Sequence, residues 1–293
     1  MIFSNKLTSG QKKFIRKFLH NKVALFSLAI IGIVMIAAIF APLIAPYNPA
    51  RQFINGLTTS GMPKGPGHQF KLGADLLGRD LLTRLIFGAR VSMLIGIVAN
   101  GVAVLLGTLL GTLAGYHQKK IGTAIMRFTD LMMAFPALLL AIALTSILRP
   151  SMWIVALVIA LVNWVQIARV IYAQVMTIRA NEFIEAAIAV GASTRRIIFR
   201  HVLPHLIPTL LVYGTLGIST TVLLESTLSF LGVGVQPPTP SWGGIINESQ
   251  TYFLDAPWLV FFPGLAILLT SLAFNLLGDA LRDCFGHEGG NVA

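Results

Sequence analysis

The chain has 293 residues, of which 55% are hydrophobic and only 11% are charged, and its mean hydropathy is +0.78. A soluble domain carries about a quarter charged residues, so this composition excludes an ordinary soluble globular protein. A formal net charge of +11 could indicate a nucleic-acid-binding protein, but the basic residues lie beside the apolar stretches, as the positive-inside rule describes. We therefore expect an integral membrane protein that contacts lipid and binds no nucleic acid.

Six long stretches of the sequence contain no Asp, Glu, Lys or Arg. A helix needs about 20 apolar residues to cross the hydrocarbon core, and each stretch approaches or exceeds that length. Because only helices and closed barrels satisfy their backbone hydrogen bonds in lipid, we expect an all-α protein with six transmembrane helices. The stretches lie between positions 22 and 51, 90 and 119, 130 and 149, 149 and 169, 200 and 225, and 255 and 279.

Basic residues are unevenly divided among the connecting segments. The N-terminal tail, 1–22, has six Lys or Arg residues and no acidic one, whereas the loop at 232–257 has no Lys or Arg. The positive-inside rule then places this tail and the C-terminal tail, 282–293, in the cytoplasm. The loop at 46–90 also carries six basic residues although this topology places it outside, but long loops weigh less in the rule.

The first apolar run, 23–45, exceeds the roughly 7–15-residue core of a cleaved signal peptide, so we expect it to remain as the first transmembrane helix. Residues 46–90 are interpreted as an extracytoplasmic loop. Its last part has Leu81 and Leu85 on one side and Asp80 and Arg84 toward the other, which predicts a separate interfacial helix. The remaining spans, within 91–281, form the predicted five-helix core.

The second span carries three glycines at intervals of four residues, Gly107, Gly111 and Gly115. Small residues at this spacing let another helix approach closely in lipid. The partner helix could belong to this chain or to a second subunit, and the spacing does not distinguish the two.

The third span, about 126–148, contains Pro136, which we expect to bend the helix. In the fourth span, about 153–176, Asn163 and Gln166 are three residues apart on one face. Polar side chains at membrane depth usually face the protein interior or a water path. The two residues could therefore line a transport pathway or form hydrogen bonds between helices.

Glu225 is the only acidic residue in the fifth span, about 205–230. An intramembrane acid is a candidate functional residue, and we include it among the possible pathway residues. Its position near the outer end of the helix weakens that interpretation. The sixth span is expected at about 258–281.

A polar, basic segment at 180–204 separates the fourth and fifth spans. Ala186 and Ala187 are strong helix formers without bulk, so a second protein could approach this helix closely. Gly191 suits the end of the helix, Ser193 can cap a second helix, and Pro204 predicts a turn back into the membrane. The residues that define the segment are Glu182, Glu185, Ala186, Ala187, Gly191, Ala192, Ser193, Leu203 and Pro204.

The order of these residues, E-A-A, then glycine, then L-P twelve residues after the glycine, resembles the EAA loop of bacterial ABC importer permeases. In that family the loop fits a cleft on a separate ATPase subunit, so the resemblance implies that 180–204 is a cytoplasmic coupling loop. His201 departs from the family pattern, which has an aliphatic residue there. Segments 73–80, 236–243 and 275–279 extend the resemblance to the C-type permease of the dipeptide/oligopeptide/nickel branch.

This resemblance implies a multi-pass protein of the bacterial cytoplasmic membrane that works with four kinds of neighbour: lipid, a second homologous permease, two ATP-binding subunits and an extracytoplasmic substrate-binding protein. Oligopeptides or dipeptides are the expected substrates, and nickel or a metal chelate is the alternative. The loop at 232–257 would face the binding protein. Its candidate contact residues are Gln236, Pro237, Pro238 and Trp242.

The sequence has no Gly-Lys pair and therefore no Walker A loop, so we expect ATP and Mg²⁺ to bind the partner subunits. No H-E-x-x-H or G-x-S-x-G motif is present, and we expect no enzyme activity, cofactor or metal site on this chain. Cys284 is the single cysteine, which excludes an internal disulfide. A self-sufficient channel or secondary transporter is less favoured, because neither internal repeats nor paired intramembrane charges are evident.

Overall fold

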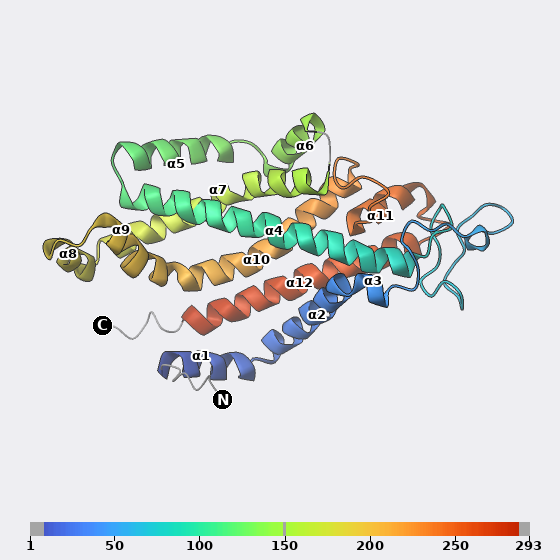
Figure 1. Cartoon of the computed structure of the whole chain (residues 1–293), viewed down its shortest axis with the longest axis horizontal. Coiled ribbons are helices and arrows are strands. Elements are labelled where there is room, and N and C mark those ends of the chain that lie inside the picture. The colour runs from blue at the N-terminus through green and yellow to red at the C-terminus, as the bar shows by residue number, and fades with distance from the viewer. Residues whose placement is uncertain (1–8, 149–150, 287–293) are drawn as a thin grey trace.

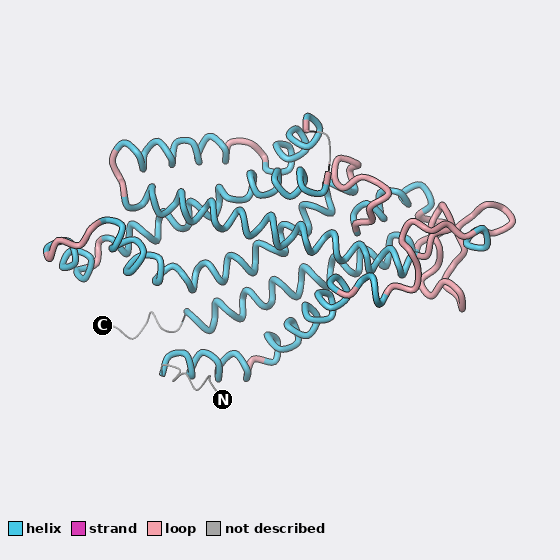
Figure 2. Tube along the Cα trace, in the orientation of Figure 1, coloured by secondary structure: helices cyan, strands magenta, loops and turns pink. Residues whose placement is uncertain are grey.

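The computed structural model is an elongated bundle of long helices that run roughly side by side (Figure 1). It describes residues 9–148 and 151–286. Within these ranges the regular structure is helical, and Figure 2 shows the longest loops gathered at one end of the bundle. The prediction of an all-α fold is confirmed, whereas the tail residues 1–8 and 287–293 lie outside the described part.

Five described helices are long and apolar enough to cross a membrane, and a sharply bent pair supplies a sixth span if it is counted as one. The five are α2 (Lys22–Ile39), α4 (Leu81–Tyr116), α7 (Met152–Arg179), α10 (Leu203–Phe230) and α12 (Trp258–Gly286), and the bent pair is α5 (Lys120–Met133) with α6 (Ala137–Ile147). The shorter elements are α1 (Ser9–His20), α3 (Ala41–Ile44), η1 (Ile54–Gly56), α8 (Glu182–Ala189), α9 (Thr194–Ile197), η2 (Ile198–Val202), α11 (Trp242–Ser249) and η3 (Gln250–Tyr252).

The three glycines of the second span let α4 pack against α7 of the same chain. A Cβ atom on Gly111 would lie 2.5 Å from the carbonyl oxygen of Ala168, and one on Gly115 would lie 2.8 Å from the Cβ of Val175. Gly107 meets α7 in the same way, one turn earlier. Of the two alternatives for these glycines, the structure therefore supports internal packing.

The prediction of a separate interfacial helix before the second span is wrong. Residues from Leu81 onward belong to one continuous helix, α4, which begins where the Asp80 carboxylate accepts a hydrogen bond from the Thr83 backbone N–H at 2.8 Å. Arg84 is 1% exposed, so the polar side of this stretch does not face water. Its charge is paired inside the protein, and the helix can therefore run straight on into the span.

Pro136 breaks the third span instead of bending it. Helix α5 ends at Met133, α6 begins after Pro136, and the two axes differ by 87°. Proline has no N–H to donate and disfavours the helical conformation of the residue before it, here Phe135, so the chain leaves the helix at this point.

The loop that follows the first span is folded onto the start of α12. The Phe53 N–H donates to the Gly78 carbonyl at 3.1 Å, and the indole N–H of Trp258 donates to the Ala74 carbonyl at 3.4 Å. Gly73 has a φ of +92° and packs against the Trp258 ring, so a side chain there would be strained and would collide with the indole. The loop is irregular, as predicted, but it is packed against the helices.

Candidate functional site

Helix α8 projects at one end of the bundle, beyond the ends of α7 and α10, and opposite the loops that precede α4 (Figure 1). Glu182, Glu185 and Ala186 are exposed, and Ala187 is half-buried. The side turned toward the bundle is anchored by Ile184, which is fully buried in the same apolar cluster as residues of α7, α9 and α10. The helix therefore presents a small, open surface on a rigid base.

The end of α8 is a Schellman motif built on Gly191, which has a φ of +80°. The Gly191 N–H donates to the Ile188 carbonyl at 2.9 Å, and the Ala192 N–H donates to the Ala187 carbonyl at 3.0 Å. Ser193 then caps α9 by accepting from the Arg196 N–H at 3.4 Å. The predicted helix stop and the predicted cap are both present.

The predicted turn into the membrane at Leu203 and Pro204 is wrong. Helix α9 continues through the π-helical segment η2, which contains His201, directly into α10, and Pro204 lies in the first turn of α10. A proline within a continuous helix removes one backbone N–H and crowds the preceding turn, and the wider π-helical hydrogen bonding of η2 lies directly before it. The protruding part thus has one separate helix, α8, while its second helix is a rigid extension of a membrane span.

Two contacts tie the long helices together at this end of the bundle. The ring of Phe183 stacks on that of His205, with centroids 5.3 Å apart and planes at 22°. On α7, the Arg179 guanidinium donates to the Tyr116 carbonyl at 2.6 Å, which joins this helix to the end of α4. A force applied to α8 would therefore reach three of the long helices.

A cavity of about 380 Å³ lies between the long helices, and we call it the polar cavity because six of its nine lining residues are polar. Asn163 and Gln166 both line it, as their common face predicts. Asn163 also donates to Thr221 Oγ1 on α10 at 3.3 Å, so it lines the cavity and bonds between helices at once. The other lining residues are Asn100, Ile167, Tyr213, Leu216, Gly217, Thr220 and Asn275.

The sequence analysis did not select the polar residues of this wall on α4, α10 and α12. Asn100 and Asn275 are uncharged polar residues within long apolar runs, and that signal could have identified them. Their meeting with Asn163 could not be foreseen, because it depends on how α4, α7 and α12 pack around α10.

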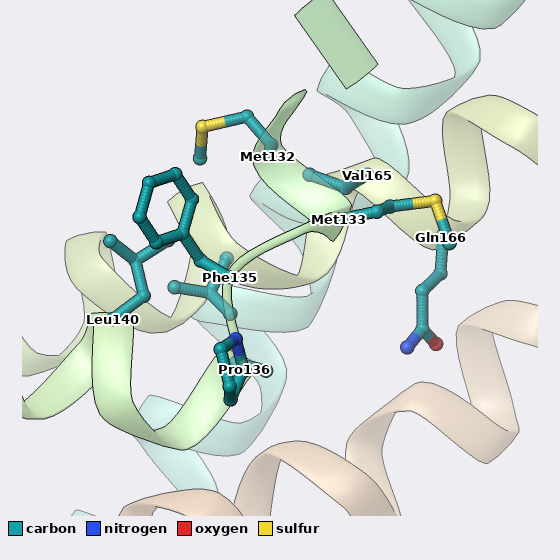
Figure 3. Close-up of a pocket in the computed structure, with 9 residues that line it drawn as sticks. Met132, Met133, Phe135, Pro136, Leu140, Val165 and Gln166 are labelled. Atoms are coloured by element: carbon teal, nitrogen blue, oxygen red, sulfur yellow. The ribbon is translucent and has the colours of Figure 1, made fainter. Parts of the chain in front are cut away.

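A second cavity, of about 220 Å³, lies at the break between α5 and α6. Methionine, phenylalanine and aliphatic side chains line most of it, and Gln166 is shared with the polar cavity. Figure 3 shows the Gln166 carboxamide directed away from Met132 and Phe135. The lining residues are Met132, Met133, Phe135, Pro136, Ala137, Leu140, Val162, Val165 and Gln166.

Glu225, the third candidate pathway residue, is not among the residues that line either cavity. Its side chain is fully buried, and its carboxylate accepts hydrogen bonds from Ser92 on α4 at 2.9 Å and from Ser229 on α10 at 2.8 Å. These hydroxyls take the place of water, so the geometry points to a structural link between the two helices.

Of the four candidate contact residues for a binding protein, three are exposed and one is buried. Gln236, Pro237 and Pro238 are exposed, but Trp242 is only 2% exposed and donates its indole N–H to the Leu85 carbonyl at 3.1 Å. Trp242 is therefore an internal anchor that holds α11 on α4. The prediction that it contacts a partner protein is wrong.

A buried cluster of charges, missed in the sequence, joins the segment before α4 to α11. Asp75 Oδ2 accepts from Arg79 at 2.6 Å and from Arg84 at 2.5 Å. Glu248 Oε2 on α11 accepts from the same two arginines at 2.5 and 2.8 Å. The four charges cancel, which makes their burial tolerable. The spacing of Asp75 and Arg79 hinted at one pair, but Glu248 is distant in sequence.

Comparison with known proteins places these features in a family. The family described as "Binding-protein-dependent transport system inner membrane component" matches residues 107–287, and "N-terminal TM domain of oligopeptide transport permease C" matches residues 12–60. The di/tripeptide transport system permease protein DppC of Pseudomonas aeruginosa is 43% identical over 97% of this chain and 94% of its own length.

Two further relatives have similar coverage. The dipeptide transport system permease protein DppC of Alkalihalophilus pseudofirmus is 40% identical over 94% of this chain and 89% of its own. The glutathione transport system permease protein GsiD of Pectobacterium atrosepticum is 37% identical over 93% of this chain and 89% of its own.

Proposed function

The chain belongs to the family of binding-protein-dependent transport system inner membrane components, and we propose that it is the membrane-spanning permease subunit of an ATP-driven importer of short peptides. The relatives support the substrate class, because their names specify di- and tripeptides, dipeptides and glutathione. These names do not favour the alternative of nickel or a metal chelate.

A permease of this kind needs partners that supply energy and substrate. The sequence has no Walker A loop, so ATP and Mg²⁺ would bind two separate ATPase subunits. A second, homologous permease would complete the pathway, and an extracytoplasmic protein would deliver the peptide. The protein would lie in the bacterial inner membrane. The excess of basic residues in its N-terminal tail supports a cytoplasmic position for both tails and for α8.

The observation that carries the coupling mechanism is the combination of an exposed α8 with a fully buried Ile184 beneath it. An ATPase that docks on the small residues of α8 could not move this helix alone, because Ile184 packs with Ile197 of α9 and Val202 of η2. Closure of the ATPases would therefore tilt α7 and α10, which both line the polar cavity, and expose that cavity to one side of the membrane after the other.

Docking at α8 can be tested with the variant Ala186→Trp. Ala186 is exposed in the chain, so a bulky ring there should leave the fold intact but occupy the space needed by a partner. Thr59→Trp places the same ring on an exposed residue of the loop before α4, at the other end of the molecule, and serves as the control. Each tagged protein is extracted gently from its native membrane, and co-purifying proteins are identified by mass spectrometry.

We expect wild type and Thr59→Trp to recover a second permease and two ATPases. Ala186→Trp should retain the second permease and lose most of the ATPase subunits. If wild type purifies alone, or as a homo-oligomer that still transports, the importer proposal fails. If Ala186→Trp retains the ATPases at the wild-type ratio, α8 is not the docking element.

A further inference from the structure

We propose that the two adjoining cavities form one peptide site, in which the carboxamide wall binds the peptide backbone and the methionine-lined cavity receives a side chain. This inference rests on the proposed importer function and specifies which part of the substrate the chain recognises.

The polar groups of this wall are all uncharged. Four carboxamides and two hydroxyls from four helices face the cavity, and none of the lining residues is charged at neutral pH. A carboxamide offers both N–H donors and a carbonyl acceptor, which are the two groups that a peptide bond needs from a partner. The six polar residues are Asn100, Asn163, Gln166, Tyr213, Thr220 and Asn275.

Part of this wall is held in place and part remains open to a ligand. Asn100 is buried and donates to the Gly214 carbonyl at 2.6 Å, in a space that exists because position 217 is glycine. In the described part of the chain, no hydrogen bond joins the side chain of Gln166 or Asn275 to another residue, and both are exposed. Fixed amides therefore stand next to amides with free donors and acceptors.

Uncharged hydrogen-bonding groups distinguish poorly between peptides of different side-chain charge. A charged wall would attract peptides of opposite charge and repel peptides of like charge. Amides instead form hydrogen bonds with the peptide backbone, which all peptides share. The wall consequently suits a transporter whose cargo varies in sequence.

The second cavity supplies a compartment lined mostly by apolar side chains. At about 220 Å³ it exceeds the engineered cavity of about 150 Å³ that binds benzene, so it has room for an aromatic or aliphatic side chain. Met132 and Met133 line it, and methionine adapts its shape to different partners. Gln166 borders both cavities, so a backbone amide bound to it would place its neighbouring side chain in this compartment.

The test removes a backbone donor from the substrate and the matching amide from the protein. The assembled importer, with its partner subunits and binding protein, is reconstituted in proteoliposomes. ATP-dependent uptake is measured for trialanine and for its depsipeptide analogue, in which an ester oxygen replaces one backbone N–H. The proteins compared are wild type, Gln166→Leu, Asn275→Leu and, as the control, Gln174→Leu, which changes a glutamine of α7 that does not line either cavity.

The decisive quantity is the ratio of trialanine uptake to depsipeptide uptake, because the contribution of the binding protein to this ratio is the same in every variant. Loss of one hydrogen bond changes an equilibrium by about threefold to tenfold. We expect the ratio to fall by about that factor in Gln166→Leu or Asn275→Leu and to stay at the wild-type value in Gln174→Leu.

A wild-type ratio in both cavity variants would overturn the inference while leaving the importer function intact. A fall of the same size in Gln174→Leu would also overturn it, because the effect would then not belong to the cavity. If wild type shows no ATP-dependent uptake of trialanine, the proposed function is wrong, and this inference, which rests on it, is wrong as well.

Discussion

Replacing Gly191 with residues that tolerate a positive φ to different degrees isolates the contribution of the α8 turn to coupling. The structure makes this position suitable, because a Cβ atom built on Gly191 meets no other atom within 4 Å. Within this chain, any effect of Gly191→Asn, Gly191→Ala or Gly191→Val therefore comes from the backbone angle and not from a collision.

The expected magnitude follows from the φ of +80°. An L-residue in the left-handed region costs about 1–2 kcal/mol, Asn costs less because its side chain bonds locally, and a β-branched residue is the least favourable. A change of about 1–2 kcal/mol alters the equilibrium between the native turn and its alternatives by about five- to thirtyfold. The two hydrogen bonds that end α8, from Gly191 and Ala192, are those at risk.

The assay is peptide imported per ATP hydrolysed by the reconstituted importer. Gly191→Asn should remain close to wild type, Gly191→Ala should couple less efficiently, and Gly191→Val should lose most of its uptake per ATP. The thermal unfolding of the purified chain should change little, because the turn is exposed. A Gly191→Val importer that moves as much peptide per ATP as wild type would refute the view that α8 must keep its angle to α9.

Three further predictions concern the stability of the bundle, measured as the midpoint of thermal unfolding of the purified chain. Gly111→Ala should cost about 1–3 kcal/mol by forcing α4 away from α7. Gly101→Ala on the same helix, where a Cβ meets nothing within 4 Å, should cost nothing and should gain up to about 1 kcal/mol from the better helix propensity of alanine. Equal losses would contradict the packing argument. Arg84→Met should cost about 3–5 kcal/mol because it leaves a buried carboxylate underpaired. Glu248→Gln should cost less because the Glu248 side chain is itself 24% exposed, and the reverse order would show that the cluster does not act as a buried pair. Trp242→Ala should cost about 3–5 kcal/mol, and an unchanged midpoint would show that Trp242 is not the internal anchor of α11.

The helices of the membrane domain could be predicted because lipid imposes the same requirement on every span. A long uncharged run must satisfy its own backbone, and this is a property of the segment alone. The same holds for the end of α8, where Gly191 and Ser193 act on neighbouring backbone groups within a few residues. Sequence reasoning succeeded at these places because both partners of each interaction lie close together in the chain.

It failed where a polar side chain had to find a distant partner. Arg84 was expected to face water at an interface, but Glu248 neutralises it from α11, and α4 consequently continues as one helix. The hydrogen bond that Ser92 on α4 donates to the Glu225 carboxylate was not identified either. In each case the partner lies more than a hundred residues away.

The sequence by itself determined the class of protein, the number of apolar spans to consider, and the local form of α8, because each depends on composition or on contacts within a few residues. Only the tertiary structure decided which glycines pack inside the chain and which polar residues are buried. It also decided that Asn100, Gln166 and Asn275 share one cavity. These outcomes depend on the rotation and depth at which the long helices meet, and a residue pattern along one helix does not contain that information.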